Sequence, residues 1–320
     1  MNAFSVLINK YNKFDEETIK KISNKLTDTN EGGIEYDGSI HRSERLYGDA
    51  IDKFNELKDE LAKKGYNFFV ESGYRGYNDQ INLWFSRMIL ASIDEYGHPI
   101  VKPAKKYFER LIAHLCIDDY PNWYKEDPLK RIEGILSVIG KTADYDLETI
   151  RKNVEFEAAP PGASEHHLGL AFDIGLIDKN GRNCDLTKPQ YIKAAYDFIK
   201  LAPEYGFILR YPNGKGLFTG CKEEIWHYRY VGSPEIAHEI MDNNLTLEEY
   251  HIANYIIDNN LLYQFENGNI DYSFLIPFIG EDAAKTIYHN SDLLNSVRNY
   301  IYIKLSKNND EEFYNGPRHI

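Results

Sequence analysis

The chain has 320 residues, 42% hydrophobic and 27% charged, which is enough for one large domain or two ordinary ones with a buried core. The net charge of −13 argues against non-specific nucleic-acid binding, because neutralising phosphates needs a basic face. Three widely spaced cysteines form neither a disulfide framework nor a cysteine-based zinc pattern. No signal peptide and no long apolar stretch is seen, so we expect a cytoplasmic protein without a membrane span, although action outside the cytoplasm stays open.

The first 80 residues predict a strand at 5–9, a helix over 15–25, a polar turn and a second helix over 43–67. The second helix is indicated by apolar residues at three- and four-residue steps, with Gly65 closing it. The segment "NFFVESGYR" predicts a strand that runs into a turn. Residues 81–157 have helical periodicity over 81–96, 103–116 and 128–139 and carry no cluster of metal ligands. We therefore expect a helical insertion that packs on a cleft or shapes it.

The remaining chain alternates strands and helices and then becomes helical. Strands are predicted in "LGLAFDIGLI", "GFILRYP" and "EIWHYRYVG", with a helix over 189–202. "GKGLFTG" lacks the P-loop order and predicts a hairpin turn, and helices are expected beyond Ser233, ending near residue 307. The fold class predicted is α+β, a small antiparallel sheet flanked by helices. We expect a catalytic domain over 1–250 and a C-terminal helical extension over 251–320 that is a candidate for self-association.

Two short segments carry the chemistry. If "LGLAFDI" is a strand, Leu168, Leu170 and Phe172 share one face, and Asp173 looks out on the other over Gly169 and Ala171. That leaves room for an ion or a substrate, which a histidine of the preceding "SEHH" turn can reach. "EEIWHYRYVG" adds a second histidine with a glutamate three residues before it. Two histidines and one carboxylate are a complete protein ligand set for catalytic zinc, which lowers the pKa of a water towards ~7, and Glu224 is the natural base.

Several motifs in the same order resemble the zinc D-alanyl-D-alanine carboxypeptidases of the VanY and VanX type. "SEHHLGLAFD" fits the S-x-H-x-x-G-x-A-x-D pattern of this family, "EIWH" fits its E-x-W-H, and "SGYR" resembles its substrate-binding turn. "LINKYN", "GFILRYP", "RYVGSPEIAHEIM" and "LTLEEY" are also similar to the family's sequences. The resemblance covers roughly residues 4–80 and 155–250. The helical insertion and the segment after about residue 252 have no counterpart in it.

The resemblance implies a role for each matching residue. One Zn²⁺ per chain would be bound by His166, Asp173 and His227, with Glu224 as general base and later proton donor. Arg75 would hold a substrate carboxylate or the developing oxyanion, for which its forked guanidinium is suited. The peptide-binding cleft would be lined by Ser164, Gln80 and Tyr211. Within these segments His167 is an alternative to His166 as ligand, and Glu165 and Glu223 are alternatives to Glu224 as base.

The function implied is hydrolysis of the terminal D-Ala from a peptidoglycan precursor or muropeptide. Alternatives on the same fold are a D,D-dipeptidase, an L,D-carboxypeptidase or a cell-wall endopeptidase. A rival of another class is a zinc-stabilised binding module without turnover. A module of that kind has no need of Glu224, so the glutamate favours an enzyme. A serine-hydrolase role for Ser164 is disfavoured, because "GASEH" lacks the final glycine of G-x-S-x-G.

Overall fold

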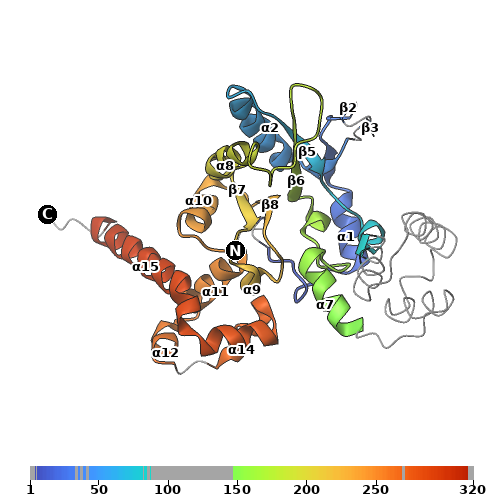
Figure 1. Ribbon diagram of the computed structural model, residues 1–320. Helices are drawn as coiled ribbons and strands as arrows, with labels where there is room; N and C mark the ends of the chain where they lie inside the picture. Colours follow the sequence, from blue (N-terminus) through green and yellow to red (C-terminus); the bar gives the residue numbers. More distant parts are fainter. Residues whose placement is uncertain are drawn as a thin grey trace.

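A four-stranded antiparallel sheet with strand order β5-β6-β8-β7 lies at the centre of the protein (Figure 1). The computed structural model describes residues 4, 6–32, 35–36, 39–40, 43–81, 83–84, 87, 147–268 and 271–315. The strands of the sheet are β5 (Asn67–Ser72), β6 (Ala171–Ile177), β7 (Phe207–Tyr211) and β8 (Glu224–Tyr230). Helices flank this sheet and follow it in the chain, so the predicted α+β class is confirmed.

One face of the sheet is covered by α2 (Gly48–Ala62) and α8 (Ile192–Leu201). Phe54 of α2 meets Phe172 of β6 edge to face at 5.1 Å between ring centroids, and Phe198 of α8 lies 4.4 Å from Tyr228 of β8. All four rings are buried. This face is the main hydrophobic core. The opposite face carries the polar side chains of the site, and Ile208 of β7 there joins a second hydrophobic cluster with the C-terminal helices.

The register of the strands gathers polar residues at one end of that opposite face. Asp173 of β6 stands directly across from His227 of β8. Tyr211 of β7 pairs with Glu224 of β8, and Ser72 of β5 reaches Asp173 across a register shift. Opposite residues of an antiparallel pair point to the same side, so the strand register places these side chains next to one another.

Smaller elements surround the sheet. Before it come α1 (Glu16–Ser23), β1 (Leu26–Asp28), β2 (Glu35–Tyr36), β3 (Ser39–Ile40) and β4 (Arg45–Tyr47). Between its strands lie α7 (Leu147–Glu157), the 3-10 turns η2 (Glu165–Leu168) and η3 (Ala202–Tyr205), and α9 (Gly216–Thr219). The helices predicted at 103–116 and 128–139, and most of the one at 81–96, lie outside the described residues.

Several predicted boundaries differ in the structure. No strand forms over 6–9 in the described part of the N-terminal segment, because the carbonyls of Phe4 and Val6 accept hydrogen bonds from the buried Arg229 guanidinium instead of pairing with a strand. The helix predicted from residue 43 begins at Gly48, because β4 before it pairs with β1. β6 begins at Ala171, since the preceding residues form η2. The predicted hairpin at 214–220 contains the short helix α9.

The C-terminal residues form a helical unit that packs against the sheet. Its elements are α10 (Pro234–Asp242), α11 (Leu247–Asp258), α12 (Leu262–Glu266), η4 (Tyr272–Phe274), α13 (Ile276–Ile279), α14 (Glu281–His289), η5 (Ser291–Leu294) and α15 (Asn295–Asn315). Their hydrophobic cluster includes Ile208, Phe218 and Val231 from the sheet region. The predicted boundary at residue 250 falls inside α11, and α15 continues past the predicted end near 307 and extends away from the body (Figure 1).

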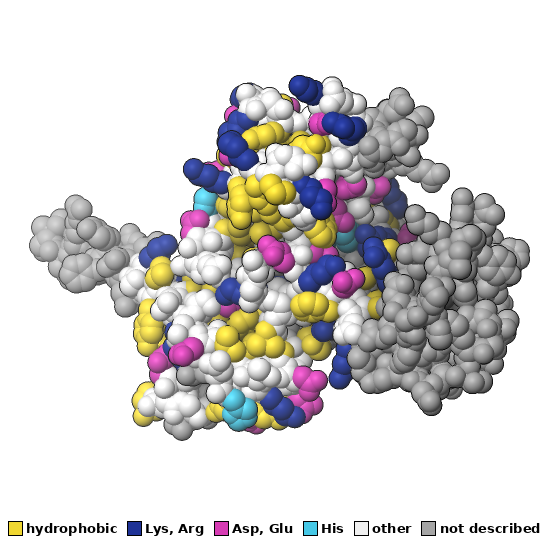
Figure 2. All heavy atoms as spheres, in the orientation of Figure 1, with side chains coloured by type: hydrophobic (Ala, Val, Ile, Leu, Met, Phe, Trp, Pro, Cys, Tyr) yellow, Lys and Arg dark blue, Asp and Glu magenta, His cyan; other side chains and the backbone are white. Residues whose placement is uncertain are grey.

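The surface of the described residues mixes both signs of charge on the face shown in Figure 2. Acidic and basic side chains are interspersed there with patches of apolar side chains. Among the helices that the structure describes, none combines the length and the apolar character that crossing a bilayer requires.

Candidate metal centre and active site

Three predicted ligand side chains converge at the polar end of the sheet. One donor atom each of His166, Asp173 and His227 lies within 4.8 Å of the others. His166 Nε2 is 3.5 Å from Asp173 Oδ2, and His227 Nδ1 is 2.9 Å from Asp173 Oδ1. Two imidazole nitrogens and a carboxylate oxygen are the donor set of catalytic zinc sites, so these residues fit a zinc ion.

Local backbone conformation brings His166 to this point. η2 ends at Gly169, whose φ of 64° turns the chain into β6, and a Cβ there would stand 2.4 Å from Leu26 Cδ2. His166 Nδ1 donates to the carbonyl of Gly73 at 2.7 Å, which leaves the lone pair of Nε2 directed to Asp173. Burial, with Arg75 adding to it, lowers the pKa of His166 to about 3. This imidazole is therefore neutral at physiological pH, as a metal ligand must be.

His167, the alternative ligand, has both ring nitrogens engaged elsewhere. Its Nε2 accepts a hydrogen bond from the Gly162 amide at 3.1 Å, so its Nδ1 carries the proton and donates to the Arg75 carbonyl at 2.7 Å. Among the described residues, the group that could hold a metal contains His166 and not His167. His167 instead fixes the turn that carries Arg75.

His227 lies between two carboxylates. Its Nδ1 bonds Asp173, while its Nε2 is buried, has no hydrogen-bond partner in the part of the chain that the structure describes, and lies 4.0 Å from Glu165 Oε2. Burial opposes the charged form, but the contacts with Asp173 and Glu165 outweigh it and raise the pKa of His227 to about 9. The metal-free imidazole is thus protonated at neutral pH, and a metal ion must displace that proton.

Glu224, the predicted base, lies beside the ligand residues and has a raised pKa. Its Oε2 lies 3.8 Å from His227 Nδ1, and its side chain is 14% exposed at the cavity. Burial raises the pKa of Glu224 to about 7, with Asp173 contributing in the same direction and His227 opposing it. Of the alternative bases, Glu165 pairs with two buried arginines that hold its pKa well below the usual range despite burial. Glu223 is exposed and does not line the cavity.

Arg75 lines the same cavity, and its guanidinium is held in place by hydrogen bonds to two other side chains. Its guanidinium donates to Gln80 Oε1 at 2.7 Å and to Ser72 Oγ at 3.2 Å. Gln80 is 1% exposed, and its amide nitrogen donates to the Ala159 carbonyl at 2.5 Å. Both ends of the Gln80 amide are therefore occupied, so its contacts position Arg75.

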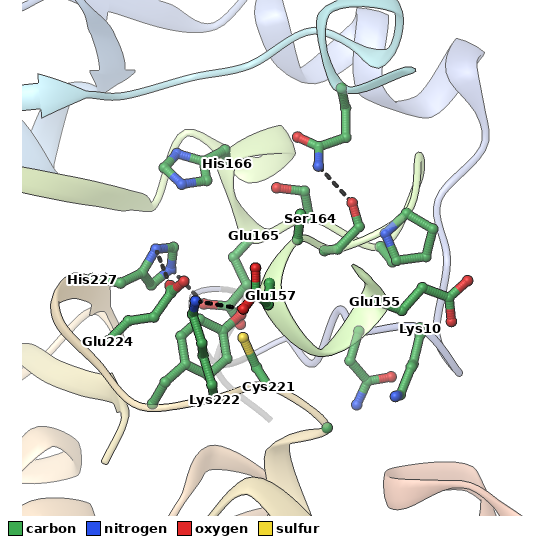
Figure 3. A pocket seen from close by; sticks show the side chains of 18 of the residues that line it. Lys10, Glu155, Glu157, Ser164, Glu165, His166, Cys221, Lys222, Glu224 and His227 are labelled. Atoms are coloured by element: carbon green, nitrogen blue, oxygen red, sulfur yellow. Dashed lines mark hydrogen bonds and ion pairs between the residues drawn. The ribbon is translucent and has the colours of Figure 1, made fainter. Parts of the chain in front are cut away.

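A cavity of about 270 Å³ joins these groups. Its lining includes every predicted site residue: Arg75, Gln80, Ser164, His166, Asp173, Tyr211, Glu224 and His227. Figure 3 shows His227 and Glu224 near His166, and Lys10 and Glu155 further along the cavity. Lys222, between these ends, forms an ion pair with Glu157 at 3.1 Å.

A buried ionic network behind the metal centre was not predicted. Glu165 binds both Arg210 and Arg229, and Arg210 also binds Glu248 of α11. All four side chains are fully buried. The signal in the sequence was an arginine inside each of two apolar strands, "GFILRYP" and "EIWHYRYVG", because a buried arginine requires partners.

This combination of a two-histidine, one-carboxylate centre, a nearby glutamate and an arginine is that of a zinc peptidase. The match to known families agrees: residues 43–233 match the VanY family, described as D-alanyl-D-alanine carboxypeptidase. The chain belongs to this family of zinc metallopeptidases.

Individual relatives are similar over parts of the chain. The bifunctional D-Ala-D-Ala dipeptidase and carboxypeptidase VanXYC of Enterococcus gallinarum is 48% identical over 95 residues, 29% of this chain and 48% of the relative. A D-alanyl-D-alanine carboxypeptidase of Enterococcus faecium is 37% identical over 137 residues, 42% of this chain and 41% of the relative. The match thus spans about half or less of these relatives' lengths.

A crystal structure of a vancomycin-resistance D,D-pentapeptidase VanY mutant in complex with Zn(II) is also similar. It is 23% identical, with a TM-score of 0.48, over 77% of this chain and 98% of that chain.

Proposed function

We propose that this protein is a zinc-dependent D-alanyl-D-alanine carboxypeptidase that binds one Zn²⁺ per chain and removes the terminal D-Ala from peptidoglycan-type peptides. The observation that carries the proposal is the meeting of His166, Asp173 and His227 with Glu224 and Arg75 in one cavity. The names of its relatives, a D-Ala-D-Ala dipeptidase and carboxypeptidase and a D-alanyl-D-alanine carboxypeptidase, support the substrate class.

Each group has a role that follows from its position. When bound, zinc supplies a Lewis acid for the scissile carbonyl and lowers the pKa of a water. Glu224 takes the proton from that water and delivers it to the leaving amine, a task suited to a carboxylate whose pKa is near 7. Arg75 binds the terminal carboxylate of the peptide, in the orientation that Gln80 and Ser72 impose on its guanidinium.

The structure's chemistry favours an enzyme over a zinc-stabilised binding module. A module needs the three ligands alone, whereas Glu224 is a partly buried carboxylate that carries an energetic cost, visible as its raised pKa. Such a cost is expected where a carboxylate has a chemical task. The D,D-dipeptidase, L,D-carboxypeptidase and endopeptidase activities are separated from the proposed one by the products formed.

Product analysis tests the proposal. Zinc-loaded protein is incubated with the dipeptide D-Ala-D-Ala, a stem pentapeptide ending in D-Ala-D-Ala, and a stem tetrapeptide ending in a single D-Ala, and the products are separated by HPLC. We expect free D-alanine and tetrapeptide from the pentapeptide, with no reaction after chelation of the metal. Cleavage of the dipeptide alone would indicate a dipeptidase, and cleavage of the tetrapeptide alone an L,D-carboxypeptidase.

We also propose that the protein acts in the cytoplasm on free precursors. Support comes from Cys184 and Cys221, which are free thiols in the described residues and suit a reducing compartment. Fractionation of the native host should find the protein with the cytosol. An extracellular form with a shortened N-terminus would contradict this location.

Self-association through the C-terminal helices is a further proposal. Its support is a set of exposed apolar side chains on α11, α12 and α15, namely Tyr255, Tyr263, Tyr302 and Ile303. Light scattering coupled to size exclusion would show a dimer that dissociates when Tyr302 and Ile303 are replaced by serine. A monomer at all concentrations would contradict it.

A further inference from the structure

Two buried polar atoms behind the metal centre face one another, and neither has a hydrogen-bond partner among the described residues. They are His227 Nε2 and Glu165 Oε2, which lie 4.0 Å apart. The His227 ring presents its other nitrogen, Nδ1, to Asp173. Glu165 therefore stands at the edge of the ring away from Asp173.

The proposed zinc site dictates what His227 Nε2 must carry. If Nδ1 binds the metal, the single proton of the neutral imidazole resides on Nε2. A buried N–H without an acceptor is costly, and the unpartnered atom that faces it is Glu165 Oε2. Histidine ligands of metals commonly donate their second N–H to a carboxylate of this kind, which fixes both the proton and the ring orientation.

We propose that Glu165 is the positioning residue of this centre. Its Oε2 accepts a hydrogen bond from the Nε2–H group of His227, which holds the ring proton on Nε2 and so keeps Nδ1 free for the metal. This inference rests on the proposed zinc-dependent function. Glu165 itself is not a ligand, because it lies at the opposite edge of the ring from Asp173.

The surroundings of Glu165 reserve one of its oxygens for this task. Arg210 Nε donates to Oε1 at 2.8 Å, and Arg229 Nη1 donates to the same oxygen at 2.9 Å. No described residue forms a hydrogen bond with Oε2. Two guanidinium groups thus fix the carboxylate by one oxygen and aim the other at His227.

The network extends from Glu165 to the C-terminal helical unit. Glu248 of α11 binds Arg210 with both oxygens, Oε2 to Nη1 at 2.9 Å and Oε1 to Nη2 at 2.6 Å. Such a forked pair fixes the plane of the guanidinium. The chain Glu248–Arg210–Glu165–His227 therefore connects α11 to a metal ligand, and two negative and two positive buried charges, with Arg229 included, balance one another. By this connection α11 belongs to the scaffold of the metal centre.

The variant Glu165→Gln tests the proposal sharply, because it reverses a hydrogen bond without changing size. The two arginines require an oxygen acceptor, so the amide oxygen of the glutamine takes the place of Oε1 and its NH₂ faces His227. That NH₂ donates to Nε2 and drives the ring proton to Nδ1, where the metal should bind. We expect zinc affinity, measured by competition with a chelator, to fall by about 10–100-fold. Nitrogen-15 spectra of histidine-labelled metal-free protein, recorded at a pH at which the ring is neutral, should show the Nδ1–H form of His227.

Glu249→Gln is the matched control. Glu249 is on the same helix as Glu248, is equally buried, and pairs with Lys215 outside the network. This variant should lose thermal stability but keep the zinc affinity of the wild type. Glu248→Gln, one contact further from the metal, should lower zinc affinity by less than Glu165→Gln. This variant also tests the proposal if the Glu165→Gln protein does not fold.

The possible outcomes separate this proposal from the proposed function. A folded Glu165→Gln protein with wild-type zinc affinity and an Nε2–H His227 would overturn the role of Glu165. Wild-type affinity in Glu248→Gln would overturn the connection to α11. Failure of the wild type itself to bind zinc would instead reject the proposed function on which the inference rests.

Discussion

Replacing Glu224 with glutamine removes the proposed base and little else. Glutamine has the same size and hydrogen-bonding shape, and Glu224 is not among the three ligand residues, which converge from β6, β8 and η2 without it. Zinc content and fold should therefore survive. Metal-free Glu224→Gln should even gain stability at pH 8, because burial disfavours the charged carboxylate that it replaces.

The expected loss of activity follows from the role of the residue. A positioned general base contributes about 10²–10⁴-fold to the rate. At ~1.36 kcal/mol per tenfold change in rate, the activation barrier should rise by about 2.7–5.4 kcal/mol. The effect should appear in kcat, since Arg75, the proposed contact of the substrate carboxylate, is unchanged.

The assay is steady-state D-alanine release by wild type and variant at equal zinc occupancy, with zinc measured in the same samples. Glu223→Gln is the control, because that side chain is exposed and outside the cavity, and it should retain wild-type kcat. A zinc-loaded Glu224→Gln enzyme with wild-type kcat would refute the assignment of the base.

Three further predictions concern the other groups of the site. Arg75→Ala should raise KM more than it lowers kcat in the same D-alanine assay if its main contact is the substrate carboxylate, and a fall in kcat alone would assign it to the oxyanion. His227→Ala should lose zinc measured by elemental analysis, because two ligands hold the metal poorly, and full zinc in the double variant with His166→Ala would contradict the ligand set. In the metal-free protein, the raised pKa of His227 means that the folded state binds the extra proton between pH 6.5 and about 9, so urea unfolding should show stability falling as pH rises through that window. The slope should flatten in His227→Gln, and an unchanged slope would contradict this protonation state.

The sequence predicted those parts of the fold that depend on local pattern. The helix α2 and the strands β6, β7 and β8 were predicted from their apolar patterns, and they were confirmed because each buries a continuous apolar face. The strand expected at 5–9 was wrong for a reason that lies far along the chain: Arg229 captures the carbonyls of Phe4 and Val6. A contact between residues more than 200 positions apart leaves no periodicity in the N-terminal segment.

In the site, too, the features that follow from sequence motifs were predictable, and those that depend on distant contacts were not. The motifs predicted which ligand side chains would meet, and the register of Asp173 opposite His227 explains why they do. Gln80 was predicted to line the peptide-binding cleft, and it lines the cavity, but only the folded chain reveals that its amide bonds Arg75 and Ala159. Glu165 was weighed as a base, and its pairing with Arg210 and Arg229 depends on two strands that join it in space.

The proposed chemistry requires a metal ion at the junction of β6, β8 and η2. Crystals of the zinc-loaded protein, measured on both sides of the zinc absorption edge, locate that ion without reference to activity. We predict one anomalous peak per chain, among His166 Nε2, an Asp173 carboxylate oxygen and His227 Nδ1. The absence of a peak there from a zinc-loaded crystal, or a single peak at other residues, would contradict the account.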